Sequence, residues 1–80
     1  MDYMEMQSKI LQIVEKNAQI GTLVDPGKDL KQSYGIDSMT LLNVLVDIED
    51  EFGFSFDMTE DLDTIFSSVN TICNYLRNKV

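Results

Sequence analysis

The chain of 80 residues can support one hydrophobic core but not two, so we expect a single domain over residues 1–80. Its 14 acidic residues against 6 basic ones give a net charge of -8, which repels nucleic acid and anionic membranes and favours basic protein partners. The same charge also keeps a small domain soluble and monomeric, and composition leaves both interpretations open.

The cysteine content and the hydropathy of the chain point to the cytoplasm. The single cysteine, Cys73, cannot form an internal disulfide, which fits a reducing compartment. No stretch approaches the ~18 consecutive apolar residues of a membrane span. The N-terminal residues MDYMEMQSK lack the basic start and apolar run of a signal peptide. We therefore expect a cytoplasmic protein without membrane insertion.

The first predicted element is an amphipathic helix near residues 2–17, where apolar residues recur at helical spacing. From Ala18 to Asp37 this pattern lapses, and Gly21, Pro26 and Gly35 interrupt any regular element. We expect a long loop here. Apolar residues scattered along it predict that the loop is ordered and held against the core; they are Ile20, Leu23, Val24, Leu30, Tyr34 and Ile36.

The second predicted helix runs from about Ser38 to Phe52 and ends near Gly53, a suitable left-handed cap. One face carries the stripe expected of a core-facing helix, made of Leu41, Val44, Leu45, Ile48 and Phe52. A second face is also apolar near its start and carries Met39, Leu42, Val46 and Asp50, with Asn43 and Glu49 at its edges. This face is either more core or a binding surface, and we favour a binding surface.

Two further helices are predicted after Gly53. A short third helix is expected at the acidic stretch of residues 57–63, with Leu62, Ile65 and Phe66 pointing inward. The fourth begins with Ser67 or Ser68 as its cap, ends near Val80, and buries a stripe of Val69, Ile72, Cys73 and Leu76. The expected fold is all-α, a small four-helix bundle of three longer helices and a short third one, with a long ordered loop between the first two.

The residues give little support for catalysis or for a metal site. Ser38 has no histidine anywhere in the chain to activate it, and a carboxylate such as Asp37, with an ordinary pKa of about 4, is a poor base for an alcohol. Lys28 and Lys31 are the lysines whose place in the loop lets them approach Ser38. A calcium-binding loop begun at Asp47 has Phe52 where glycine is required. Cys73 fits a small buried hydrophobe.

Ser38 leaves two interpretations: it is a helix cap, or a point of covalent attachment. The segment GIDSM, residues 35–39, resembles the G-x-D-S-L signature of acyl carrier proteins and related peptidyl carrier domains. The lead-in DLKQSYGIDS, the later segment DIEDEFGFSF and the closing FSSVNTICNYL are also similar to that family. The resemblance thus covers nearly the whole chain.

The resemblance implies that Ser38 carries a covalent 4′-phosphopantetheine arm derived from coenzyme A. In the family a separate, magnesium-dependent phosphopantetheinyl transferase supplies the base and the metal, so the chain itself needs no histidine and is a non-catalytic carrier. Asp37 is then a contact for the transferase. A helix start is also a favourable place for the anionic phosphodiester.

The resemblance also implies partners that load and process acyl groups held as thioesters, with basic patches that dock on the second helix. The residues expected to meet them are Met39, Leu42, Asn43, Val46, Asp47, Glu49, Asp50 and Glu51. The first half of that helix, SMTLLNVLV, has no acid, and Asn43 stands where a glutamate is common in the family. We therefore expect a docking surface that is more apolar near Ser38 and negative further along.

The cargo pathway stays open at this point. Fatty acid and polyketide synthesis both fit. The acid-free start of the second helix and the Phe56-Asp57 pair depart from the pattern of housekeeping fatty acid carriers, so a specialised carrier fits at least as well. A peptidyl or aminoacyl carrier is an alternative. A different class of protein is also possible: an unmodified acidic helical interaction module in which Ser38 is only a cap and Met39, Leu42 and Val46 bind one partner.

Overall fold

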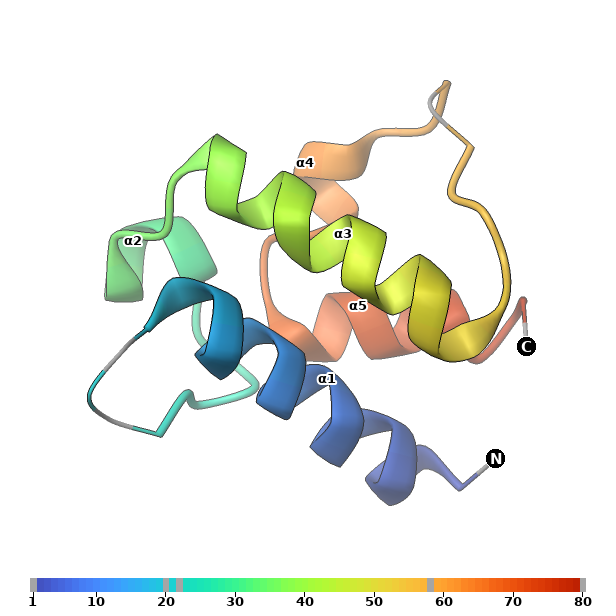
Figure 1. Ribbon diagram of the computed structural model, residues 1–80, viewed down its shortest axis with the longest axis horizontal. Helices are drawn as coiled ribbons and strands as arrows, with labels where there is room; N and C mark the ends of the chain where they lie inside the picture. The colour runs from blue at the N-terminus through green and yellow to red at the C-terminus, as the bar shows by residue number, and fades with distance from the viewer. Residues whose placement is uncertain (1, 20, 22, 58, 80) are drawn as a thin grey trace.

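The structure is a computed structural model that describes residues 2–19, 21, 23–57 and 59–79. Within these ranges the chain forms five helices and no strand, which confirms the predicted all-α class. The helices are α1 (Tyr3–Ala18), α2 (Leu30–Tyr34), α3 (Ser38–Phe52), α4 (Leu62–Ile65) and α5 (Val69–Leu76). In Figure 1, α1 and α3 run in opposite directions, and α1 packs against both α3 and α5, while α4 contacts α5.

The core lies where the apolar stripes of the three longer helices meet. Ile10 of α1, Ile48 of α3 and Ile72 of α5 are each fully buried at 0% exposure. Burying one such side chain stabilises the fold by about 1.5–3 kcal/mol. Phe56 extends this core after α3, because its ring packs on Phe66 and stacks on Tyr75. The predicted stripe of α3 is buried from Leu41 to Ile48, as expected.

The predicted uninterrupted loop between the first two long helices is wrong, because it contains α2. This helix has only five residues and buries only Leu30, so it leaves no periodic apolar signal in the sequence. The features of the sequence that mark α2 are a capping residue at each end, Asp29 and Gly35. The Asp29 side chain accepts a hydrogen bond from the backbone N–H of Gln32 at 2.8 Å, and Gly35 adopts φ +66°, the left-handed conformation that glycine tolerates best.

The segment around α2 is ordered, as predicted. Val24, Leu30 and Ile36 are buried, and the N–H of Leu30 donates to the carbonyl of Ser67 at 2.7 Å. Tyr34 is half-buried, and its hydroxyl accepts from the N–H of Asp25 at 2.6 Å. Leu23 is 85% exposed, so the expectation that it anchors the loop is wrong. Ile20 lies outside the described residues.

The end of α3 and the start of α5 lie at residues that cap these helices. Gly53 ends α3 with φ +68°, as predicted. Ser68 caps α5 through a reciprocal pair of hydrogen bonds with Thr71, which confirms one of the two predicted caps. The expected end of α5 near Val80 is wrong: the helix stops at Leu76, its last buried residue, and the N–H of Lys79 donates to the carbonyl of Leu76 in a tighter turn. Val80 itself is not described.

The predicted third helix is present as α4, but it ends at Ile65, one residue before the last apolar residue of its predicted stripe, Phe66. Leu62 and Ile65 of α4 are half-buried, and Phe66 is buried just beyond the helix as its C-cap residue. Leu62 and Phe66 line the cavity next to Ser38, opposite leucine side chains of α3. In the described part of the chain, no helix combines the length and the apolar character that a bilayer crossing requires.

Candidate functional site

Ser38 is the first residue of α3, and its side chain is exposed. The N-cap is the preceding residue: the Asp37 carboxylate accepts a hydrogen bond from the backbone N–H of Thr40 at 2.8 Å. The Asp37 carbonyl accepts the first intrahelical bond, from Leu41 at 3.1 Å. The interpretation of Ser38 as the helix cap is therefore wrong, and within the described residues no hydrogen bond engages its hydroxyl.

Asp37 is held in its ionised form. The hydrogen bond from the Thr40 backbone, together with one from the Thr40 side chain, lowers the pKa of the Asp37 carboxyl below its ordinary value. A carboxylate with a lowered pKa is an even weaker base than an ordinary one. Asp37 thus fixes the start of α3 and places a negative charge beside Ser38, but it is not suited to deprotonate the serine hydroxyl.

The start of α3 fits an anion attached to Ser38. The backbone N–H groups of Ser38 and Met39 precede the first intrahelical hydrogen bond, which is donated by Leu41. The helix behind them is 15 residues long, so its dipole places partial positive charge at this end. An exposed hydroxyl, free N–H groups and a positive helix end together suit a phosphodiester.

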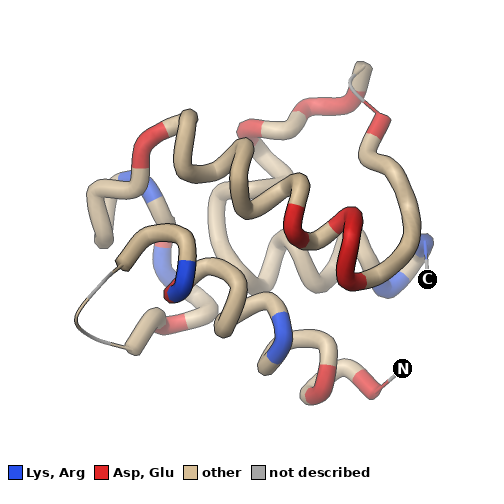
Figure 2. Tube along the Cα trace, viewed as in Figure 1, with Lys and Arg blue, Asp and Glu red and all other residues tan. Residues whose placement is uncertain are grey.

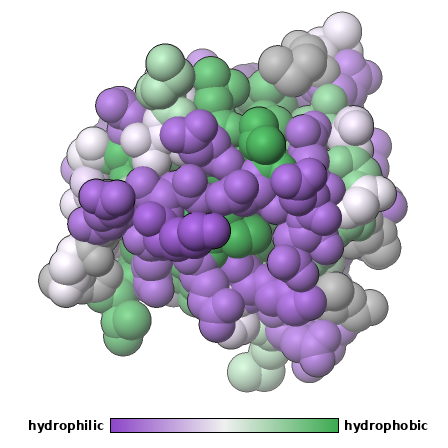
Figure 3. Space-filling model, in the orientation of Figure 1, coloured by the Kyte–Doolittle hydropathy of each residue, from purple (hydrophilic) through white to green (hydrophobic). Residues whose placement is uncertain are grey.

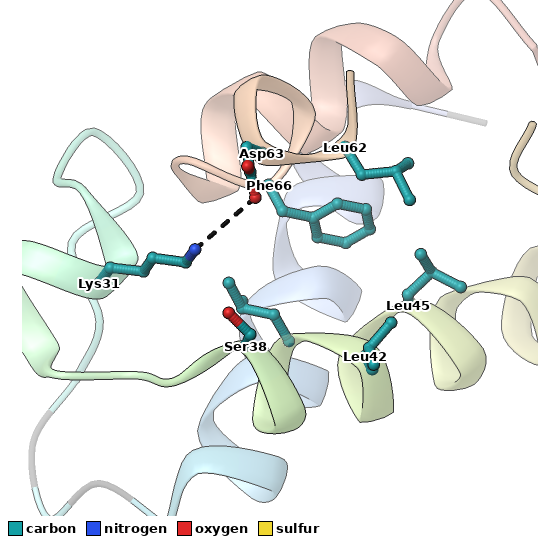
Figure 4. Close-up of a pocket in the computed structure, with 8 residues that line it drawn as sticks. Lys31, Ser38, Leu42, Leu45, Leu62, Asp63 and Phe66 are labelled. Atoms are coloured by element: carbon teal, nitrogen blue, oxygen red, sulfur yellow. Dashed lines mark ion pairs between the residues drawn. The ribbon is translucent and has the colours of Figure 1, made fainter. Parts of the chain in front are cut away.

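A cavity of about 220 Å³ opens beside Ser38, between α3 and α4. Figure 4 shows Leu45 of α3 and Leu62 and Phe66 of the α4 region pointing toward this space, with Ser38 at its edge. The complete lining is Lys31, Ser38, Leu41, Leu42, Leu45, Leu62, Asp63 and Phe66. Apart from Ser38 and one lysine and one aspartate, every lining residue is apolar, so the cavity suits a hydrocarbon group.

The two charged residues of this lining come from different helices. Lys31 projects from α2 and Asp63 from α4, and their Nζ and Oδ1 atoms are 3.6 Å apart (Figure 4). Of the two loop lysines considered from the sequence, the structure places Lys31 at the opening, while Lys28 is not part of the lining. The sequence could not reveal Asp63 or Phe66 as site residues, because only the packing of α4 brings them to Ser38.

The second face of α3 is exposed, so the alternative that it is more core is wrong, and its role in binding stays a prediction. Met39, Leu42 and Val46 are 70%, 48% and 52% exposed. They form an apolar ridge that begins next to Ser38 and continues for two turns along α3. Figure 3 shows a mostly hydrophilic face on which apolar side chains reach the surface in the upper part, where α3 and α4 lie. Asn43 is also exposed beside this ridge.

The acids of the second half of α3 are largely engaged within the protein. Asp47 accepts a hydrogen bond from Asn17 at 2.8 Å and is half-buried. Glu49 accepts from the backbone N–H of Phe56 at 2.8 Å. Glu51 forms an ion pair with Lys9 at 3.2 Å. Asp50 is exposed, and Figure 2 shows this acidic stretch close to the basic residues of α1.

Cys73 is not a candidate nucleophile. It is fully buried in the stripe of α5, and desolvation raises the pKa of its thiol to about 11. The thiolate, which is the reactive form, is therefore disfavoured at neutral pH. This confirms its interpretation as a small buried hydrophobe.

Comparison with known proteins agrees with the geometry. A family model described as the phosphopantetheine attachment site matches residues 8–76. No relative was found among the curated proteins compared. The matched region contains α2, α3, α4 and α5 and most of α1, and it includes the GIDSM segment. The chain therefore belongs to the family of phosphopantetheine-binding carrier proteins, whose domain is the attachment site for covalent 4′-phosphopantetheine.

Proposed function

We propose that this protein is a non-catalytic acyl carrier in which Ser38 receives the phosphopantetheine arm. The observation that carries the proposal is the exposed Ser38 hydroxyl at the first position of α3, next to a cap formed by Asp37 rather than by Ser38 itself. When attached, the arm supplies a terminal thiol that holds acyl groups as thioesters.

In this proposal, different side chains cap α3 and carry the arm: Asp37 caps the helix and Ser38 is the attachment point. Because the Asp37 carboxylate satisfies the N–H of Thr40, a group added to Ser38 displaces no hydrogen bond that holds α3 together. Two N–H groups at the helix start can then receive the phosphodiester oxygens. The base and the metal for the attachment reaction belong to a separate phosphopantetheinyl transferase, and we propose Asp37 as one of its contacts.

The cavity favours an acyl cargo over a polar aminoacyl cargo. Its walls include Leu42, Leu45, Leu62 and Phe66, and none of these side chains offers a hydrogen bond. A hydrocarbon chain placed against these walls gains burial. A charged amino group there loses its water, and the carboxylate of the lining, Asp63, is 90% exposed and already paired with Lys31. We therefore place the protein in fatty acid, polyketide or related synthesis, acting in the cytoplasm as a monomer that visits several enzymes.

Partner enzymes dock on the ridge of Met39, Leu42 and Val46 in this proposal. The ridge is exposed and starts beside Ser38, so a partner that covers it also receives the arm. Asn43 extends the docking surface near the ridge, and Asp47, Glu49, Asp50 and Glu51 extend it toward the end of α3, where they attract basic residues. Asp47 and Glu49 contribute mainly through their charge, because their oxygens already bind Asn17 and the Phe56 backbone.

The experiment is intact mass spectrometry after incubation with a broad-specificity phosphopantetheinyl transferase, magnesium and coenzyme A. Wild type should gain one phosphopantetheinyl group and Ser38→Ala none. Ser33→Ala, which changes an exposed serine of α2, is the matched control and should be modified like wild type. Lack of modification, or modification at another residue, would sink the carrier proposal and favour the unmodified interaction module.

A further inference from the structure

Lys31 is the basic residue that lines the opening next to Ser38. Its backbone is held in place, because Asp29 caps α2 at one end, Gly35 closes the other, and the N–H of Leu30 donates to the Ser67 carbonyl at 2.7 Å. Its side chain is 45% exposed and carries its charge on a flexible four-carbon stem. Lys31 thus has a fixed base and a mobile ammonium group at the edge of the attachment site.

The present partner of Lys31 is weakly held. The Lys31 Nζ and Asp63 Oδ1 atoms are 3.6 Å apart, which is longer than a good charge-assisted hydrogen bond. The Asp63 side chain is 90% exposed, so water and salt screen the pair strongly. A stronger anion at the same opening can therefore displace Asp63 from Lys31 at little cost.

A phosphodiester on Ser38 introduces such an anion. It adds a negative charge to the residue that follows Asp37, whose lowered pKa keeps it ionised, at the opening that Asp63 also lines. The phosphate oxygens lie only one bond beyond the phosphorus that the Ser38 hydroxyl oxygen carries, so they remain at this opening. The helix start offsets part of the repulsion, and the nearby ammonium group of Lys31 can offset more.

We propose that Lys31 is the counterion of the phosphodiester on Ser38, and that it leaves Asp63 when the arm is attached. The proposal rests on the proposed function, since it requires a phosphodiester at Ser38. In the unmodified protein Lys31 links α2 to α4 through Asp63. In the modified protein Lys31 binds the anion at the start of α3, and the link between α2 and α4 beside the cavity is released.

The test follows the side-chain ammonium signal of Lys31 by NMR in protein labelled with ¹⁵N-lysine. In the unmodified protein, Asp63→Asn should shift the Lys31 Nζ signal, because it removes the partner. In the phosphopantetheinylated protein the same substitution should leave that signal unchanged, because Lys31 already binds the phosphate. An equal response to Asp63→Asn in both forms would show that Lys31 stays with Asp63 and would overturn the inference.

A second measurement observes the anion directly. The ³¹P signal of the phosphopantetheinylated protein should shift and narrow in Lys31→Gln, because the phosphate loses its counterion and the arm moves more freely. Lys28→Gln, which neutralises an exposed lysine outside the cavity lining, is the matched control and should leave the signal as in wild type. A ³¹P signal that is the same in all three proteins would contradict the role of Lys31.

Mass spectrometry of each sample distinguishes the two ways of failing. If no phosphopantetheine is added at Ser38, both the carrier function and this inference are wrong. If the group is added but neither NMR signal responds as expected, the carrier function stands and only the role of Lys31 is wrong.

Discussion

Two valines on α3 allow the docking ridge to be tested with the same chemical change. Val44 is fully buried in the core at 0% exposure, while Val46, two residues later, is 52% exposed on the ridge. Replacing either by alanine removes the same two carbon atoms. Any difference between Val44→Ala and Val46→Ala therefore reports the environment of the side chain and not its chemistry.

The expected effects on stability differ severalfold. At about 0.8 kcal/mol for each buried methylene, Val44→Ala loses about 1.6 kcal/mol of transfer free energy, and the cavity left behind brings the total to about 2–3 kcal/mol. The Val46 side chain is only about half buried in the free protein, and water fills the space that Val46→Ala leaves. This substitution therefore lowers the free energy of unfolding by about 0.8 kcal/mol at most. In thermal denaturation followed by circular dichroism, Val44→Ala should lower the melting temperature by roughly 10–20 °C. Val46→Ala should lower it by less than about 6 °C.

The expected effects on function are the reverse. Docking buries the part of Val46 that is still exposed, worth about 0.8 kcal/mol, so Val46→Ala should slow phosphopantetheine loading by about fourfold in kcat/KM. Val44→Ala should load at the wild-type rate when assayed well below its melting temperature. If Val46→Ala loads as fast as wild type, or unfolds as readily as Val44→Ala, the ridge is not a docking surface.

How far the sequence predicts this fold depends on the length of each signal. The long helix α3 was predicted with both boundaries, because its stripe continues for about three turns and Gly53 follows as its cap. The five-residue α2 was missed, since one buried residue, Leu30, gives no periodicity. Short helices take most of their stability from tertiary packing, and that packing is not written locally in the sequence.

The candidate site shows the same limit. The sequence singled out Ser38, but its interpretation of Ser38 as a possible cap overlooked Asp37, although aspartate is as good a capping residue as serine. The backbone decides: Asp37 is extended, with φ -86° and ψ 171°, and Ser38 is already helical. Lys31 and Asp63 lie 32 positions apart in the sequence, and Asn17 and Asp47 lie 30 apart. Local sequence patterns therefore could not predict either pairing.

Three further predictions follow from the charges and the cavity. Asp50→Asn and Glu51→Gln should each slow loading less than Val46→Ala does at physiological salt. Because exposed charges act mainly on the rate of encounter, their effect on kcat/KM should vanish as the salt concentration rises. An effect that persists at high salt would contradict this. Asp37 has a folded-state pKa below its ordinary value of 3.8, so its contribution to stability is complete above that pH and is lost as the pH falls through the lower folded pKa. Asp37→Asn keeps a capping residue but removes this titration, so urea denaturation should show a shallower loss of stability below pH 3.8 than in wild type, and an identical acid limb would refute the role of the carboxylate. The last prediction concerns cargo: an acyl chain that enters the cavity binds only the folded state, so the melting temperature of the loaded protein should rise as the chain lengthens and then level off when about 220 Å³ is filled. Leu62→Phe narrows the cavity from the α4 side, so in this variant the melting temperature should stop rising at a shorter acyl chain than in wild type. A melting temperature that does not depend on chain length would mean that the cargo remains in solvent.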